Sequence, residues 1–244
     1  MRLTRCPVEL SLAAGKTLPL PEEAANHLVR VMRLREGDRC VLFNGDGHDY
    51  AATLSSISKR EVLVQIDSAQ AVDNESPLPI TLLQGIARGE KMDLILQKAT
   101  ELGVTAIIPV NAERTEVKLD AARAEKRIAH WRNVVGSACG QSGRACIPDI
   151  SAPQSLAAAA AALPEQTLRL TLDPQGEHRL SSLPMAPANG VVIAIGPEGG
   201  WSPRDRQQLA EAGFQGLQLG PRILRTETAG LAAIAALQAR LGDL

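Results

Sequence analysis

The chain has 244 residues with a formal net charge of −1, and 45% of them are hydrophobic. This length allows one large domain or two smaller ones, each with a buried core. The nearly neutral charge excludes a strongly basic nucleic-acid-binding protein. Aromatic residues at 2% exclude an interleaved aromatic platform for single-stranded bases, so any RNA site must be a local patch.

The cysteines and the N-terminus indicate the compartment. The four cysteines include no C-x-x-C pair, which disfavours zinc and thioredoxin-like chemistry. No apolar signal-peptide core follows "MRLTR", and no apolar run reaches membrane-spanning length. We therefore expect a cytoplasmic protein with reduced cysteines, no metal and no membrane partner.

The segment "PEEAANHLVRVMRL" (21–34) has the periodicity of a helix whose inner face carries Leu28, Val31 and Met32. Positions spaced i, i+4 and i+7 share a second face of such a helix. On that face we expect Asn26, Arg30 and Arg33.

The rest of the first 70 residues indicates β-structure. "CVLF", the turn "NGDG" (44–47) and "YAATLSSI" predict a hairpin, and "EVLVQI" (61–66) predicts a further strand with Val62, Val64 and Ile66 on one face. The polar, proline-bearing stretch 71–79 predicts a domain boundary, giving domains 1–72 and 73–244.

Beyond this boundary strands and helices alternate, which predicts an α/β domain with a mainly parallel sheet. Ser202, Pro203 and Asp205 are typical of a helix N-terminus, and Gly103 of a residue just past a helix end. The expected strands are 80–86, 104–110, 167–172, 190–195 and 214–219, and the expected helices are 89–103, 120–140, 155–163, one beginning at 202, and 226–242.

Two glycine-marked turns, "IGPEGGW" (195–201) and "LGPRILRTETAG" (219–230), leave strands through Gly-Pro and lead to helices. Neither matches a phosphate-binding glycine pattern. Glycine lets backbone groups approach a flat ring, and open α/β sheets bind ligands at the carboxyl ends of their strands. The alternative is two tight connections without a ligand.

These turns, as "GPEGGWSPRD" and "LGPRILRTETAGLAAIAAL", closely resemble the bacterial 16S rRNA uridine-N3 methyltransferases of the SPOUT superfamily. The blocks "HLVRVMRLREGD" (27–38), "RGEKMDLILQKATELGV" (88–104), "ERTEVKL" (113–119) and "QSGR" (141–144) extend the resemblance along nearly the whole chain. The sequence departs from the family at Gly140, where glutamate is usual.

The resemblance implies a PUA-like RNA-binding β-barrel over 1–72 and a SPOUT-type α/β domain over 73–244 with a C-terminal trefoil knot. General rules of chain topology disfavour such a knot. The implied reaction transfers a methyl group from S-adenosyl-L-methionine to N3 of a uridine in 16S rRNA of the small ribosomal subunit. The residues implied to bind this cofactor are Leu172, Ile195, Gly196, Pro197, Glu198, Gly199, Gly200, Leu219, Gly220, Ile223, Leu224, Thr226 and Glu227.

Uridine N3 carries a proton, so a base or a cation that stabilises the resulting anion would assist transfer. Glu198 and Arg225 are the catalytic candidates. Glu198 would act as the base or orient a loop by accepting hydrogen bonds from backbone N–H groups. Arg225 would neutralise the anion, hold a phosphate, or form a surface salt bridge. Thr226 is the expected N-cap of the last helix, and Glu227 suits its first turn electrostatically.

The resemblance also assigns cationic residues that bind RNA phosphates, which gives affinity with little sequence discrimination.

Two other functions stay open: a SPOUT enzyme acting on a base or ribose 2′-O of tRNA, and a noncatalytic RNA-binding assembly factor. The last helix is apolar around much of its circumference, which indicates a homodimer interface testable at Ala233 or Leu237, or a helix that fills the core. The expected RNA-binding residues are His27, Arg30, Arg33, Arg88, Lys91 and Arg114.

Overall fold

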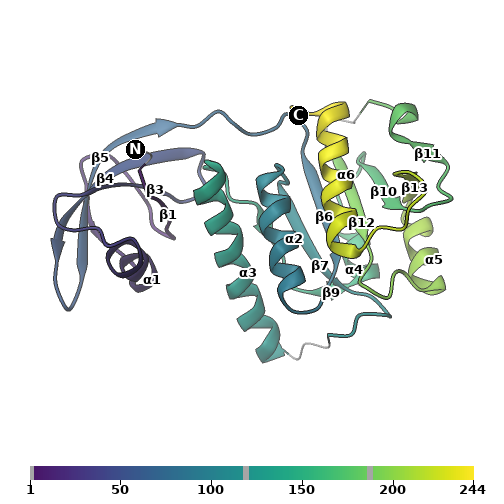
Figure 1. The fold of residues 1–244 in the computed structure, drawn as a ribbon, viewed down its shortest axis with the longest axis horizontal. Coiled ribbons are helices and arrows are strands. Elements are labelled where there is room, and N and C mark those ends of the chain that lie inside the picture. The colour runs from purple at the N-terminus through teal and green to yellow at the C-terminus, as the bar shows by residue number, and fades with distance from the viewer. Residues whose placement is uncertain (1–2, 118–120, 186–188) are drawn as a thin grey trace. The chain divides into compact units, whose positions relative to one another are not determined.

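The computed structural model describes residues 3–117, 121–185 and 189–244 (Figure 1). Internal contacts divide the chain into two compact units, Met1–Glu75 with Val135–Ile147, and Ser76–Val134 with Pro148–Leu244. The domain bounds 1–72 and 73–244 stay predictions. No helix in the described segments has both the length and the apolar character needed to cross a membrane.

A five-stranded sheet forms the first unit, in the order β1-β3-β4-β5-β2. β3 and β4 pair antiparallel around the turn 44–47, where Gly45 and Gly47 have φ of 92° and 85°, so the predicted hairpin is confirmed. The strands are β1 (Arg5–Pro7), β2 (Thr17–Pro19), β3 (Arg39–Phe43), β4 (His48–Ile57) and β5 (Val62–Ala71).

Alternate residues of these strands build the core of the first unit. Val62, Val64 and Ile66 are buried on one face of β5, as their period of two predicts. They pack in one cluster with Leu42 of β3 and Leu54 of β4. Burial of one face sets the strand register, because a slip of one residue would expose this whole set.

The single helix predicted over 21–34 is wrong. A short α1 (Glu22–Ala25) continues as a π-helical turn, η1 (Asn26–Val31), in which the Met32 N–H donates to the His27 carbonyl at 2.9 Å. The i→i+5 bond changes the angular spacing of the side chains, so the face expected from a 3.6-residue period does not form. Leu28 is buried, but Val31 and Met32 are 67% and 43% exposed.

Arg33 also lies outside the predicted helical face. It follows the π-helical turn with φ of 59°, in the left-handed region, and it does not continue a stripe with Asn26 and Arg30. A non-glycine residue rarely adopts this conformation.

A parallel sheet forms the second unit, in the order β11-β13-β10-β12-β6-β7-β8, with β9 also pairing with β7. Every described pairing in it is parallel, which confirms the sequence prediction. β8, β9 and β11 were not predicted, since two residues show no periodicity. The strands are β6 (Ile80–Gly85), β7 (Ala106–Asn111), β8 (Asp149–Ile150), β9 (Gln154–Ser155), β10 (Leu168–Leu172), β11 (His178–Arg179), β12 (Val191–Ile195) and β13 (Gln215–Gln218).

Helices cover both faces of this sheet (Figure 1). α2 (Glu90–Glu101) and α6 (Thr226–Leu241) lie together on one face, where Leu82 and Ile195 approach Gly230 of α6. α4 (Leu156–Ala161) and α5 (Pro203–Glu211) cover the other, in a cluster with Leu83 and Ala194. Consecutive residues of a strand, such as Leu82 and Leu83 of β6, therefore face opposite sides of the sheet. The remaining helices are α3 (Ala121–Ser142), within which the two units divide, and the 3-10 turn η2 (Leu180–Ser182).

Helix ends match the sequence prediction in two cases and differ in a third. Ser202 and Asp205 form a reciprocal capping box at α5, and Gly103 follows α2 with φ of 87°, both as predicted. Thr226 is not the N-cap of α6. Arg225 holds that position, and Thr226 is the first helical residue, with its hydroxyl directed to other partners.

The residues chosen to test a dimer interface are buried inside the chain. Ala233 and Leu237 of α6 have no exposed surface, so arginine at either would disrupt the core whether or not the protein dimerises. Leu231 and Ala235 are partly exposed on the same helix. The dimer and the trefoil knot both stay predictions.

Candidate functional site

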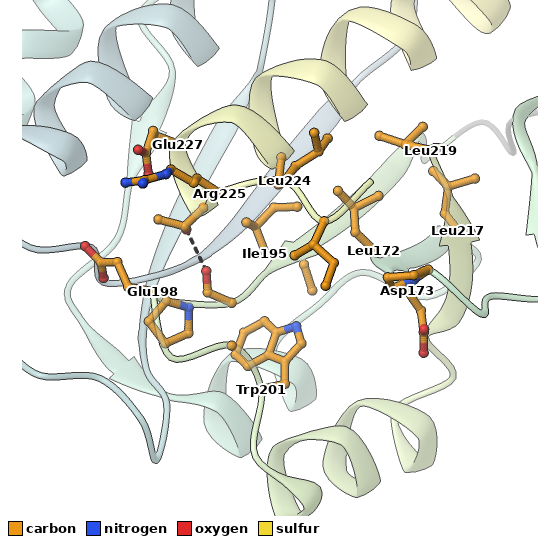
Figure 2. Close-up of a pocket in the computed structure, with 18 of the residues that line it drawn as sticks. Leu172, Asp173, Ile195, Glu198, Trp201, Leu217, Leu219, Leu224, Arg225 and Glu227 are labelled. Carbon is orange, nitrogen blue, oxygen red and sulfur yellow. Dashed lines mark hydrogen bonds between the residues drawn. The ribbon is translucent and has the colours of Figure 1, made fainter. Parts of the chain in front are cut away.

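A cavity of about 480 Å³ lies where three adjacent strands of the second unit end (Figure 2). β13, β10 and β12 are neighbours and parallel, so their carboxyl ends meet at one edge of the sheet. Residues 196–201 leave β12 and residues 219–225 leave β13, so both glycine turns reach this edge. Such an edge is where open α/β sheets bind ligands.

Most residues predicted to bind the cofactor line this cavity, as does the catalytic candidate Arg225. Gly199 is the exception, since it lies in the turn but not in the lining. The lining includes Leu172, Ile195, Gly196, Pro197, Glu198, Gly200, Leu219, Gly220, Ile223, Leu224, Thr226 and Glu227.

Sequence reasoning missed several other lining residues, among them Asp173, Pro174, Leu217 and Arg222. Asp173 and Pro174 directly follow β10, so the strand order identifies them although no motif does. Trp201 also lines the cavity, with 7% of its surface exposed, and its Nε1 donates to Thr171 Oγ1 at 3.1 Å.

Apolar and charged side chains line different parts of the cavity. Figure 2 shows leucines 172, 217 and 219 toward one side of the view with Asp173 beside them, Glu198, Arg225 and Glu227 at the opposite side, and Leu224 between the two groups. This division suits a ligand with a flat apolar part and a charged part.

A buried hydrogen-bond chain ties the two turns together. The Thr226 hydroxyl donates to the Gly196 carbonyl at 2.6 Å, and it accepts from Gln84 Nε2 at 3.1 Å. Gln84, at the end of β6, is fully buried and also donates to the Gly85 carbonyl at 2.8 Å. The sequence did not single out Gln84, whose partner lies 142 residues away.

The end of β6 also touches the first turn through bare backbone. A Cβ atom on Gly85 would lie 2.6 Å from the backbone nitrogen of Pro197, so no larger residue fits without displacing the turn. Gly200 has φ of 63°, a conformation that favours glycine. The turn is therefore positioned by contacts from β6 as well as by its own residues.

The surroundings of Glu198 favour the loop-orienting alternative over the base. Its Oε1 accepts from the Arg88 backbone N–H at 3.0 Å and from Lys91 Nζ at 3.2 Å. Burial by itself raises the pKa of the Glu198 carboxyl. The hydrogen bonds from the Arg88 N–H, from the N–H of Glu198 itself and from Lys91, together with the Lys91 charge, outweigh burial, so the pKa lies below the ordinary 4.5. An ionised carboxylate of low pKa is a weak proton acceptor at neutral pH.

Three of the predicted RNA-binding residues gather around this turn. Besides Lys91, Arg114 donates from Nη1 to the Gly199 carbonyl at 3.0 Å, and Arg88 Nη1 lies 3.6 Å from Glu116 Oε2. The side chains of Lys91 and Arg114 therefore brace the turn, whereas Arg88 reaches it only through its backbone N–H. The other three, His27, Arg30 and Arg33, are exposed in the first unit.

Two charged side chains at the cavity, Glu227 and Arg225, have charged atoms without a partner among the described residues. Glu227 Oε2 is buried without a hydrogen-bond partner among the described residues. Buried carboxylate oxygens without a donor are costly, so this atom points to a donor supplied from outside the chain. The exposed Arg225 side chain forms no ion pair within the part of the chain that the structure describes.

Comparison with known proteins bears on this site. An RNA methyltransferase domain family matches residues 74–238, and an RNA methyltransferase PUA domain family matches residues 20–67. Ribosomal RNA small subunit methyltransferase E from Bacillus subtilis is 34% identical, covering 91% of this chain and 89% of the relative. The same enzyme from Buchnera aphidicola subsp. Schizaphis graminum is 32% identical, covering 100% of this chain and 98% of the relative.

Two solved structures are similar over the full length of both chains. A methyltransferase from Legionella pneumophila, in complex with bound SAM, is 38% identical with a TM-score of 0.94. Ribosomal RNA small subunit methyltransferase E from Neisseria gonorrhoeae, bound to S-adenosyl methionine, is 41% identical with a TM-score of 0.91. The chain therefore belongs to the family of RNA methyltransferases that includes ribosomal RNA small subunit methyltransferase E.

Proposed function

We propose that this enzyme transfers a methyl group from S-adenosyl-L-methionine to N3 of a uridine in 16S rRNA of the small ribosomal subunit. The observation that carries the proposal is the cavity at the carboxyl ends of β10, β12 and β13, framed by both glycine turns. Full-length relatives at 38% and 41% identity were crystallised with this cofactor bound.

The residues present fit such a cofactor. About 480 Å³ lies within the usual range for small-molecule sites. The leucines and Ile195 suit a flat ring, and the Glu227 oxygen without a partner is an acceptor suited to an ammonium group. The backbone of the turns at Gly196 and Gly220 would hold the ring edge, as the residues predicted above imply. When bound, the cofactor supplies an electrophilic methyl group on a sulfonium.

The chain's own contribution is to orient the groups and stabilise charge. Arg225, which lines the cavity and is free of an ion pair among the described residues, would stabilise the anion that forms when uridine N3 gives its proton to a water molecule. Glu198 would hold the turn 196–200 in place through Arg88 and Lys91. N3 lies on the Watson–Crick edge, so the target base must be unpaired or extruded.

The RNA substrate would be held by the exposed cations of both units. Residues 1–72 would act as the RNA-binding domain, with His27, Arg30 and Arg33 on its surface. We also propose a cytoplasmic homodimer with a SPOUT-type trefoil knot. Partly exposed Leu231 and Ala235 are the positions on α6 at which an interface is testable.

The test is methylation of small subunits isolated from cells lacking the modification, with radiolabelled cofactor and mass-spectrometric mapping of the labelled nucleotide. We expect label on one uridine of 16S rRNA, as the N3-methyl base, and strong loss of rate with Arg225→Ala. Label on tRNA or on a ribose 2′-oxygen would contradict the proposal, and cofactor binding without turnover would indicate an assembly factor.

A further inference from the structure

The end of the π-helical turn carries exposed apolar side chains between arginines. Val31 is 67% exposed and Met32 is 43% exposed, while neighbouring Leu28, Val29 and Leu34 pack on the core of the first unit. We name residues Arg30–Arg33 the basic-apolar tip. The π-helical turn produces this arrangement, because its spacing turns Leu28 inward and leaves Val31 and Met32 facing outward.

The tip lies in a locally positive stretch of a chain whose net charge is −1. Residues 27–39 contain four arginines and only two acidic residues. Both acids are engaged locally: Glu36 Oε1 accepts from the Ile57 N–H at 2.6 Å, and Asp38 Oδ2 accepts from the Arg35 N–H at 2.8 Å. The hairpin end that follows Ile57 carries Lys59, Arg60 and Glu61, a net charge of +1. The surface around the tip therefore complements a polyanion.

Arg33 occupies a backbone conformation that would favour glycine. Its φ is 59°, and the chain reverses there so that the Leu34 N–H donates to the Leu28 carbonyl at 3.0 Å. An arginine in this region is strained, and the described residues provide its side chain with no ion pair or hydrogen bond that would offset the strain. The left-handed backbone itself is explained by the bond that ends the helical turn, and the exposed Arg33 side chain is available to a ligand.

The protein exposes no Phe, Tyr or Trp side chain for base stacking. All five aromatic residues, Phe43, Tyr50, Trp131, Trp201 and Phe214, are buried. An unpaired base on this protein can therefore pack against aliphatic side chains, guanidinium planes or an exposed histidine such as His27, and Val and Met offer apolar contacts of this kind.

We propose that the basic-apolar tip is a contact site for unpaired RNA, in which Val31 and Met32 pack against an exposed base and Arg30 and Arg33 bind the flanking phosphates. This inference rests on the proposed function, since it concerns the RNA substrate. It assigns base contact to two residues that carry no charge, and it separates base contact from phosphate binding.

The experiment compares binding of two RNAs, a hairpin with an unpaired loop and a fully paired duplex of equal length, over a range of salt concentrations. The paired change Val31→Ser with Met32→Gln should weaken loop binding by about fivefold or more, the size of one lost base contact, and leave duplex binding and the salt slope unchanged. Met185→Gln, at a residue 79% exposed in the second unit, is the matched control and should bind as wild type.

Arg33→Gly separates a substrate role from a structural one. Glycine suits the left-handed backbone, so thermal stability should stay the same or rise, while RNA affinity falls and the salt slope decreases by about one. A structural arginine would give lower stability instead.

Three results would overturn the inference. In the first, the wild type methylates rRNA, and the Val31→Ser, Met32→Gln protein binds loop RNA as tightly as the wild type does. The inference then fails while the proposed function stands. The second is a changed mass in solution with unchanged RNA affinity, which would make the tip an interface between copies. In the third, the wild type neither binds nor methylates rRNA, and the proposed function fails as well.

Discussion

Thr226→Val tests whether one hydroxyl holds the two cavity turns together. Valine keeps the shape of threonine but removes the hydroxyl, whose O–H donates to the Gly196 carbonyl and whose oxygen accepts from Gln84. Thr226 is only 7% exposed, so water replaces this oxygen poorly. Gln84 Nε2 keeps its bond to the Gly85 carbonyl, whereas the Gly196 carbonyl loses its only described donor.

The expected loss of stability follows from this one carbonyl left without a donor. Leaving one buried acceptor without its donor destabilises a protein by about 1–3 kcal/mol. For a chain of this length each kcal/mol lowers the melting temperature by about 2–4 °C, so we expect a decrease of roughly 2–12 °C. The bound cofactor also needs the first turn in place. If about 1 kcal/mol of this cost falls on the complex, cofactor affinity drops roughly fivefold.

The measurements are thermal unfolding and calorimetric titration with S-adenosyl-L-methionine. Thr228→Val is the matched control, because Thr228 is an exposed threonine in the same first turns of α6 and should change neither value. Equal melting temperature and equal affinity for Thr226→Val and Thr228→Val would refute the reasoning. A loss of stability alone would show that the bond serves the fold without shaping the site.

Gly196→Val should abolish cofactor binding in a folded protein, measured by calorimetry with circular dichroism as the control, because its Cβ would lie 3.2 Å from the carbonyl carbon of Gly200. Glu198 has a lowered pKa, so its contribution to stability is present above about pH 4.5 and lost as pH falls through the folded value. The difference in melting temperature between wild type and Glu198→Gln should therefore shrink below pH 4.5, and a constant difference would contradict this. A thiol reagent at pH 8 should modify at most Cys146 in the native protein and four thiols after unfolding, since burial raises the pKa to about 11 for Cys6, about 12 for Cys40 and about 11 for Cys139.

Patterns that repeat locally were enough to predict most elements. Val62, Val64 and Ile66 alternate because β5 buries one face, and the capping pair Ser202 and Asp205 lies within one turn of chain. The glycine turns could be recognised for the same reason, since a tight turn places its requirements on adjacent residues. The parallel sheet followed from alternation of strands and helices along the chain.

What the sequence by itself determined is therefore the period of each element, the position of the two turns and their Gly-Pro chemistry. The tertiary structure alone decided that Gln84 and Thr226 meet across 142 residues, and that the Glu198 carboxylate accepts from Lys91 and the Arg88 N–H. It also decided that residues 26–31 form a π-helical turn, which leaves Val31 exposed. The physical reason is the same in each case: partners distant in sequence compete for the same side chain or backbone bond, and local periodicity carries no record of which partner the folded chain supplies.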